Sequence, residues 1–226
     1  MKEDDNIYIL EEEQDPDQSP MNFAAYGDEE RLKEEQEEKG TNTRKTSFGL
    51  LMKIMFNPVE GWKSLRRSNI SLEGLQAGCF YPLLALLSIS EFADYFYSVN
   101  IGLSQIMTKA VVIFVSFFFG FYCIQMVLSL LLPKDMAEKY EGRFGKEYSV
   151  VALSTLALFS IITNLLPMLW PILIFLPIWT LYIMFKGARF FKFEEKQEMK
   201  FFVLAAISAI GIPLLIEWGL TELLPY

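Results

Sequence analysis

The sequence predicts an all-α membrane protein with five transmembrane helices, a cytoplasmic amphipathic segment and a disordered acidic N-terminal tail. Residues 148–185 contain no Asp, Glu, Lys or Arg. This run is long enough for two crossings, because a helix of roughly 20 residues spans the bilayer core. The chain is 52% hydrophobic with a mean hydropathy of +0.27, which is high for a soluble domain. Its charge is also segregated from its apolar runs.

Acidic residues are concentrated at the N-terminus. Residues 1–45 hold 15 acidic and 6 basic side chains, a net charge of −9. Low hydrophobicity and high net charge predict disorder for this tail, and a docking segment that folds on a partner is the alternative. We expect residues 46–73 to form a juxtamembrane amphipathic segment and residues 74–226 to form the transmembrane domain.

The composition argues against an enzyme. The chain has no histidine, which removes the commonest general base and a frequent metal ligand. Cys79 and Cys123 both lie in apolar runs, where small buried side chains are the simplest expectation. No cleavable signal peptide is visible at the acidic start. Without a nucleophile–base pair, phosphate loop or metal-ligand spacing, we expect no catalysis, cofactor, metal or nucleic-acid binding.

Residues 48–67 have the pattern of an amphipathic segment at the membrane surface. Apolar residues recur at three-to-four spacing, and the segment is too short and too charged to span the bilayer. Asn57-Pro58 is expected to break it, because proline suits the first position of a new helix. Trp62, Arg66 and Arg67 are predicted to lie at the membrane interface, where tryptophan is enriched.

Five apolar stretches predict the spans. They cover residues 75–95, 109–132, 148–165, 171–185 and 201–220. The third and fourth form a hairpin with Asn164, Pro167 and Pro171 at its turn, where helix breakers are tolerated. Pro82 and Pro177 are the chief irregularities within the spans.

The basic residues near the spans predict the orientation. Thirteen lysines and arginines fall on one side of the five spans, and Lys109 alone falls on the other. Because cytoplasmic flanks are enriched in Lys and Arg, we expect a cytoplasmic N-terminus and an outside C-terminus. The protein is predicted to be an integral multi-pass membrane protein, located in the inner membrane if it is bacterial.

A polar cluster of Glu91, Asp94, Lys109 and Glu217 is predicted at the outer ends of the spans. Glu91 and Glu217 each lie about 24 Å along their helices, and Asp94 shares a helix face with Glu91. We interpret the cluster as a group of hydrated carboxylates at the outer membrane surface that pair with Lys109. An ion or proton path is the alternative, which the lack of an acidic residue at the midplane weakens.

Deeper polar residues and glycines are expected to mediate helix packing. Polar side chains in spans commonly form interhelical hydrogen bonds, and small residues let helices approach. The polar residues concerned are Gln125, Thr155, Ser160 and Thr163. The glycines concerned are Gly74, Gly78, Gly120, Gly187 and Gly211.

Three short motifs stand around the predicted spans. They are Asn57-Pro58-Val59-Glu60-Gly61-Trp62, Tyr81-Pro82-Leu83-Leu84 and Tyr182-Ile183-Met184-Phe185-Lys186-Gly187-Ala188. From about Phe48 to its C-terminus the chain resembles the Yip family of Ypt/Rab-interacting membrane proteins, in its prokaryotic branch. The resemblance implies a cytoplasmic N-terminus and a compact five-helix domain. In eukaryotic relatives it implies a non-enzymatic role in membrane traffic with small GTPases among the partners, although no motif here marks a GTPase-binding site.

The predicted function is therefore a non-enzymatic membrane scaffold or adaptor of the Yip type. Its expected partners are the lipid bilayer and an unidentified membrane or cytoplasmic protein. The alternative is a small permease or transporter subunit that moves an ion or small solute. A homo-oligomer is compatible with both interpretations.

Overall fold

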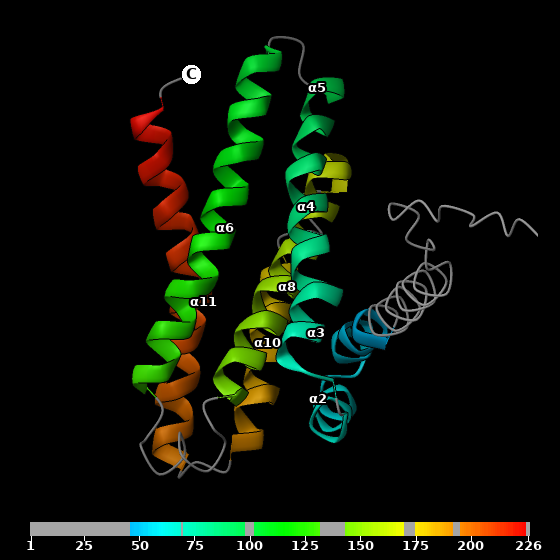
Figure 1. Cartoon of the computed structure of the whole chain (residues 1–226), viewed down its shortest axis with the longest axis vertical. Helices are drawn as coiled ribbons and strands as arrows, with labels where there is room; N and C mark the ends of the chain where they lie inside the picture. The colour runs from blue at the N-terminus through cyan, green and yellow to red at the C-terminus, as the bar shows by residue number, and fades with distance from the viewer. Residues whose placement is uncertain are drawn as a thin grey trace, which may run out of the picture. The chain divides into compact units, whose positions relative to one another are not determined.

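Helices account for all the regular structure in the residues that the computed structural model describes (Figure 1). These residues are 46–68, 70–97, 102–131, 143–169, 175–191 and 195–224. The predicted acidic tail and the centre of the predicted hairpin turn lie outside the described residues. Within the described part, the all-α prediction is confirmed.

Among the described residues, four helical segments are long and apolar enough to cross a membrane, which makes this an integral multi-pass membrane protein. They are Leu72–Tyr97, Leu103–Leu130, Gly145–Leu165 and Gln197–Leu223. The first is built from α3 (Leu72–Leu75), the π-helical turn η1 (Gln76–Phe80), α4 (Tyr81–Ser90), the 3₁₀ turn η2 (Glu91–Ala93) and α5 (Asp94–Tyr97). The others lie in α6 (Leu103–Leu131), α8 (Arg143–Leu165) and α11 (Glu195–Leu223).

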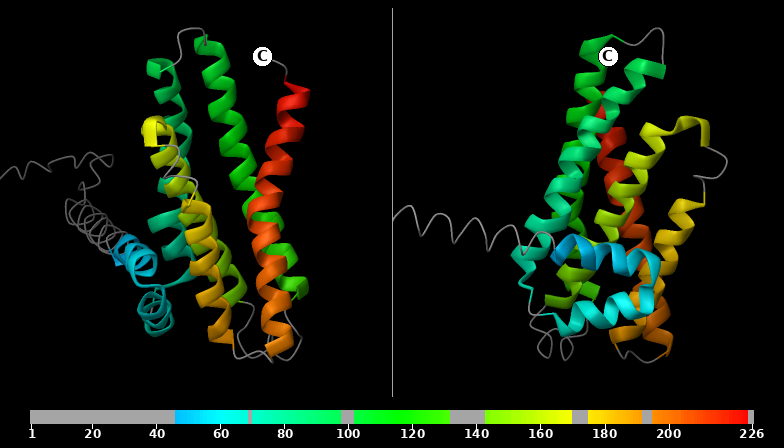
Figure 2. Two further views of the ribbon diagram at one scale, coloured as in Figure 1. Left: turned by 180° about the vertical axis from the view of Figure 1, so that it is seen from behind. Right: turned by 90° about the vertical axis from the view of Figure 1, so that its right-hand side faces the viewer.

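The fourth predicted span corresponds to a shorter helix, α10 (Leu176–Ala188). Its 13 residues reach about 20 Å, less than the roughly 30 Å of a bilayer core. Figure 2 shows α10 running antiparallel to α8 and to α11, so it returns the chain to the end where α8 begins. The count of five spans stays a prediction.

Parts of the two predicted charged loops are helical. α8 begins at Arg143, α10 continues past Lys186 to Ala188, and α11 begins at Glu195. Helices can run beyond the hydrocarbon into water, where charged side chains carry no desolvation penalty, so the charges mark the membrane boundary rather than the helix ends.

Close packing holds α6 along α11, the most extensive helix contact of the described part. A Cβ placed on Gly120 of α6 would lie 3.1 Å from Cγ of Pro213, which stands inside α11. The expected close approach is therefore found at Gly120. It is absent at Gly211, where a Cβ would meet no atom within 4 Å.

The polar residues of the spans mostly bond within their own helices. The hydroxyls of Thr155 and Thr163 donate to the carbonyl oxygens of Val151 and Phe159, four residues earlier. The prediction of interhelical bonds is wrong for both, because the carbonyl of the preceding turn is the nearest acceptor for a helical threonine. Nε2 of Gln125 is buried with no hydrogen-bond partner in the described part of the chain.

Two short helices precede the bundle, Thr46–Phe56 and α2 (Pro58–Arg67). Asn57 caps α2, with its side chain accepting from the Glu60 amide at 3.3 Å, and Pro58 occupies the first turn. The predicted helix break is therefore confirmed. Figure 2 (right) shows the two helices antiparallel to each other and across the direction of the long helices.

Gly61 lets the two short helices touch through their backbones. A Cβ at this position would collide with the backbone of Ile54 in the facing helix, whereas a Cβ on Gly49 would meet nothing within 4 Å. We expect Gly61→Ala to destabilise the domain by about 1–3 kcal/mol, because the facing backbone has no room to yield. Thermal unfolding of the purified protein measures this.

Gly49→Ala is the matched control for this prediction. It makes the same change in an exposed helical position, where alanine is favoured over glycine by about 0.5–1 kcal/mol. The melting temperature is expected to fall for Gly61→Ala and to hold or rise for Gly49→Ala. Equal melting temperatures for both variants would contradict the backbone contact.

Candidate functional site

The indole of Trp62 joins α2 to the helix bundle. Trp62 is 1% exposed, and its Nε1 donates a hydrogen bond of 3.1 Å to the carbonyl oxygen of Ile183 in α10. Its ring stacks on Tyr148 of α8 with centroids 5.7 Å apart. Gly187 makes room for it, since a Cβ there would lie 2.6 Å from the indole ring. At Gly187 the predicted close approach is therefore made by the side chain of Trp62.

Two further side-chain donors close the same junction. The hydroxyl of Tyr148 donates to the Met184 carbonyl at 2.9 Å. Trp179 Nε1 donates to the Met55 carbonyl at 3.0 Å, near the end of the helix Thr46–Phe56. The last carbonyls of a helix lack partners within that helix, so Trp179 caps this helix from α10. We call the set of Met55, Trp62, Tyr148 and their partners in α10 the indole junction.

The surroundings of Trp62 add to the expectation from the sequence. Its place at the depth of the membrane interface stays a prediction, while the structure shows that its indole is enclosed by α8 and α10. The periodicity correctly marks one apolar face of α2, formed by Pro58, Gly61, Trp62 and Leu65. That face is covered by protein, because the bundle offers the indole a stacking partner and a hydrogen-bond acceptor that lipid tails lack.

An exposed basic face extends over α2 and the helix before it. We define it by four residues: Lys53 of the helix Thr46–Phe56, and Lys63, Arg66 and Arg67 of α2. Arg66 Nη1 donates to the Phe190 carbonyl at 3.0 Å, so this arginine is positioned by the 3₁₀ turn Arg189–Phe191 that follows α10. Lys63 bonds Glu60 at 2.8 Å and lowers the pKa of that carboxyl, which keeps Glu60 charged. Arg66 and Arg67 therefore lie on the outer side of α2, and their membrane contact remains a prediction.

Other basic residues at this end are part of the scaffold. Arg143 donates from Nη2 to the Ile70 carbonyl at 2.7 Å and from Nε to Glu147 at 2.5 Å. Ser47 Oγ donates to the Gly74 carbonyl at 3.1 Å. These bonds tie the helix Thr46–Phe56 to the start of the first span, and the segment just before that span to α8. Replacing Arg143 would therefore disturb the fold as well as any surface charge.

The predicted polar cluster is present at the other end of the bundle, where α5 ends and α6 begins. Lys109 Nζ lies 2.8 Å from Glu91 Oε2 and 2.6 Å from Asp94 Oδ2. Asn164 of α8 donates to the other oxygen of Glu91 at 2.6 Å and to Ser90 Oγ at 3.0 Å. Glu91 is only 2% exposed, so this carboxylate is held inside the protein by a cation and an amide.

Glu217 belongs to the surroundings of this cluster. It lies on α11, within electrostatic range of Glu91 and Lys109, but its side chain forms no ion pair among the described residues. Asn164 is the member that sequence reasoning missed, having been assigned to a turn. A signal was present, because Asn164 is the only amide side chain in the uncharged run 148–185.

The cluster is suited to holding helices together. It links η2, α6 and α8 through charge-assisted hydrogen bonds to the buried carboxylate of Glu91, and such bonds are stronger than neutral ones. In the part of the chain that the structure describes, no three Cys, Asp or Glu residues come close enough to hold a metal ion. A buried carboxylate in a span is also the usual mark of an ion pathway.

Comparison with known proteins gives one result. The family model described as the Yip1 domain matches residues 52–216, which is more than half of the chain. All three motifs quoted from the sequence fall within this range. Neither the curated proteins nor the solved structures yield a match to the chain.

The buried ion pair predicts a strong dependence of stability on Lys109. Lys109→Met leaves the carboxylate of Glu91 buried without its cation, which costs about 3 kcal/mol, the low end for a broken buried pair because Lys109 is partly exposed. Adding Glu91→Gln removes the stranded charge, so the double variant is expected to recover much of the loss. Thermal unfolding of the wild type, both single variants and the double variant measures the coupling, and purely additive losses would contradict the pairing.

Proposed function

Because the chain belongs to the Yip1 domain family, we propose that it is a non-enzymatic membrane scaffold or adaptor that binds a protein partner at its cytoplasmic face. The multi-pass helical domain anchors the protein in the bilayer. The family match supports the class of protein. The partner surface is inferred from the residues at the basic end of the bundle.

The observation that carries this proposal is the rigid mounting of α2. An amphipathic helix at the membrane surface usually buries its apolar face in lipid. In α2 the apolar face instead packs against the protein at the indole junction. The basic face then points away from the bundle on a helix that is already ordered. Binding an acidic partner there requires little further ordering of the backbone, which favours affinity.

We further propose that this end of the bundle is cytoplasmic and that the C-terminus lies outside. The cation bias of thirteen to one supports this orientation. The acidic tail, residues 1–45, would then extend from the same side as the basic face and supply a second binding segment. The acidic tail would then bind a basic partner, and the basic face would bind an acidic one.

A permease or transporter subunit is the second candidate. The buried Glu91 favours it, since carboxylates in spans often mark ion or proton paths. The π-helical turn η1 favours it too, because π-helical turns are frequent at functional sites. Against it, the middle of the bundle is filled by apolar side chains such as Phe80, Leu84 and Phe121. A transporter needs a polar route at this depth.

The orientation predicts which residues an impermeant reagent reaches. In a variant with Cys79 and Cys123 replaced by serine, we place single cysteines at Tyr140 and Leu224. A membrane-impermeant maleimide added to intact cells is expected to label only the cysteine at position 224. Both positions should react after the membrane is permeabilised, and equal labelling in intact cells would rule out the orientation.

Two sets of substitutions separate the adaptor from the transporter. The first neutralises the exposed basic residues as Lys53→Gln, Lys63→Gln and Arg67→Gln, and leaves Arg66 and Arg143 in their structural bonds. The second neutralises the other end as Glu91→Gln, Asp94→Asn and Glu217→Gln. The first set is expected to abolish recovery of partner proteins from crosslinked membranes, because it removes the charge that attracts an acidic surface.

The second set is expected to leave partner recovery unchanged. Both variants are also reconstituted in liposomes and assayed for ion flux, with melting temperatures as a check on folding. The adaptor proposal fails on one pattern of results. In that pattern the wild type shows an ion flux, the carboxylate variant loses it, and the basic-face variant keeps both the ion flux and the recovery of partner proteins. Deleting residues 1–45 in parallel separates the role of the tail from that of the basic face.

A further inference from the structure

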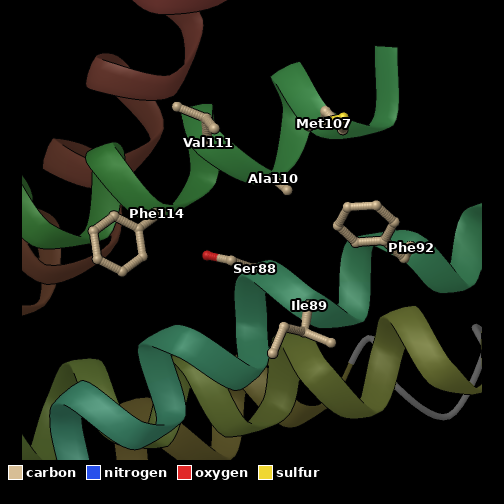
Figure 3. A pocket seen from close by; sticks show the side chains of 7 residues that line it. All are labelled: Ser88, Ile89, Phe92, Met107, Ala110, Val111 and Phe114. Atoms are coloured by element: carbon tan, nitrogen blue, oxygen red, sulfur yellow. The ribbon is translucent and has the colours of Figure 1, made fainter. Parts of the chain in front are cut away.

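A groove lies between the first span and α6 (Figure 3). Its volume is 310 Å³, and it is wide open rather than enclosed. Residues from two helices line it: Ser88, Ile89, Phe92, Met107, Ala110, Val111 and Phe114. Figure 3 shows Phe92 and Met107 together at one end and Phe114 at the other.

The groove lies at hydrocarbon depth. Both of its walls belong to segments that can cross a membrane, Leu72–Tyr97 and Leu103–Leu130. Ser88 lies about 24 Å from the start of the first segment, and Phe114 lies about 17 Å from the start of the second. Both positions fall inside a core of about 30 Å centred on these helices. The medium that meets the groove is therefore lipid tails rather than water.

The lining offers a ligand no free hydrogen-bond donor. Ser88 is the only polar residue of the lining, and its hydroxyl donates to the Leu84 carbonyl of its own helix at 3.2 Å. Ile89 and Val111 on the rim are 63% and 59% exposed, so they present methyl groups to the opening. An empty groove of this kind forfeits dispersion contacts along both walls. A flexible hydrocarbon chain restores them.

The end of the groove near Phe92 and Met107 adjoins the polar cluster. Lys109 lies between two lining residues in α6, and Asp94 follows Phe92 by two residues. Both side chains are partly exposed, and two carboxylates surround the one ammonium, a formal charge of −1. Lys109 has three N–H donors and two carboxylate partners among the described residues. A third donor is therefore available to a phosphate, while Asp94 favours a nearby cation.

We propose that this groove binds one acyl chain of a phospholipid whose zwitterionic headgroup carries a primary ammonium, as in phosphatidylethanolamine. The acyl chain lies between the first span and α6 along Ala110. The headgroup phosphate accepts from Lys109, and its ammonium lies beside Asp94. An anionic headgroup without an ammonium meets the same phosphate contact but leaves the excess carboxylate charge uncompensated.

Photocrosslinking in the bilayer tests the site. The full chain is reconstituted in vesicles of phosphatidylethanolamine and phosphatidylglycerol with a trace of either lipid carrying a diazirine on one acyl chain. Crosslinked peptides are mapped by mass spectrometry. With labelled phosphatidylethanolamine, adducts are expected to concentrate on residues 88–92 and 107–114, and several-fold fewer are expected there with labelled phosphatidylglycerol.

Plugging the groove from either wall should displace the chain. Ala110→Leu and Ser88→Leu fill it from opposite helices, so one remains informative if the other fails to fold. Each is expected to reduce adducts in the groove several-fold and to leave adducts elsewhere on the protein unchanged. Ala85→Leu, at an exposed position of α4 outside the lining, is the matched control and should have no effect.

Asp94→Asn tests the headgroup contact and should reduce the preference for phosphatidylethanolamine over phosphatidylglycerol. Adducts spread evenly along both helices, or insensitive to both plugs, would overturn the site. Equal adduct yields for the two wild-type lipids would overturn the assignment of the headgroup.

Discussion

The hydrogen bond from the buried indole of Trp62 to the Ile183 carbonyl is the contact on which the basic end of this domain depends. Helices as short as α2 and Thr46–Phe56 are marginal alone and take their stability from tertiary contacts. The indole supplies both apolar area and a directed donor. Gly187 provides the space and Tyr148 the stacking surface, so residues from two helices, α8 and α10, surround one side chain of α2.

The two ends of the bundle are held by different means. Lipid tails are as apolar as the helix surfaces, so packing and polar contacts, rather than the hydrophobic effect, drive association in the membrane. The middle relies on packing, as at Gly120 against Pro213. At one end, Lys109 and Asn164 hold the carboxylate of Glu91. At the other, side-chain donors bond to backbone carbonyls. This division leaves the basic face exposed.

The helices of this protein were predicted from the sequence more accurately than the contacts between them. Long uncharged runs predict membrane helices because the bilayer imposes a minimum length, and Asn57-Pro58 marks a helix start because of local chemistry. The burial of Trp62 depends on neighbours more than 30 residues away, which no local pattern reports. Lys109 and Glu91 were paired correctly because opposite charges in a span need each other. Asn164 was missed because a turn and a buried hydrogen bond both suit an asparagine.

The indole junction also constrains the order in which the protein is made. Trp62 and Ile183 are separated by 121 residues, and a chain emerges from the ribosome N-terminus first. The two short helices are complete before their acceptor in α10 has been synthesised. Until then Trp62 has neither its acceptor at Ile183 nor the space that Gly187 provides. This hydrogen bond can therefore form only late in synthesis, when α10 has been made and α11 is still to follow.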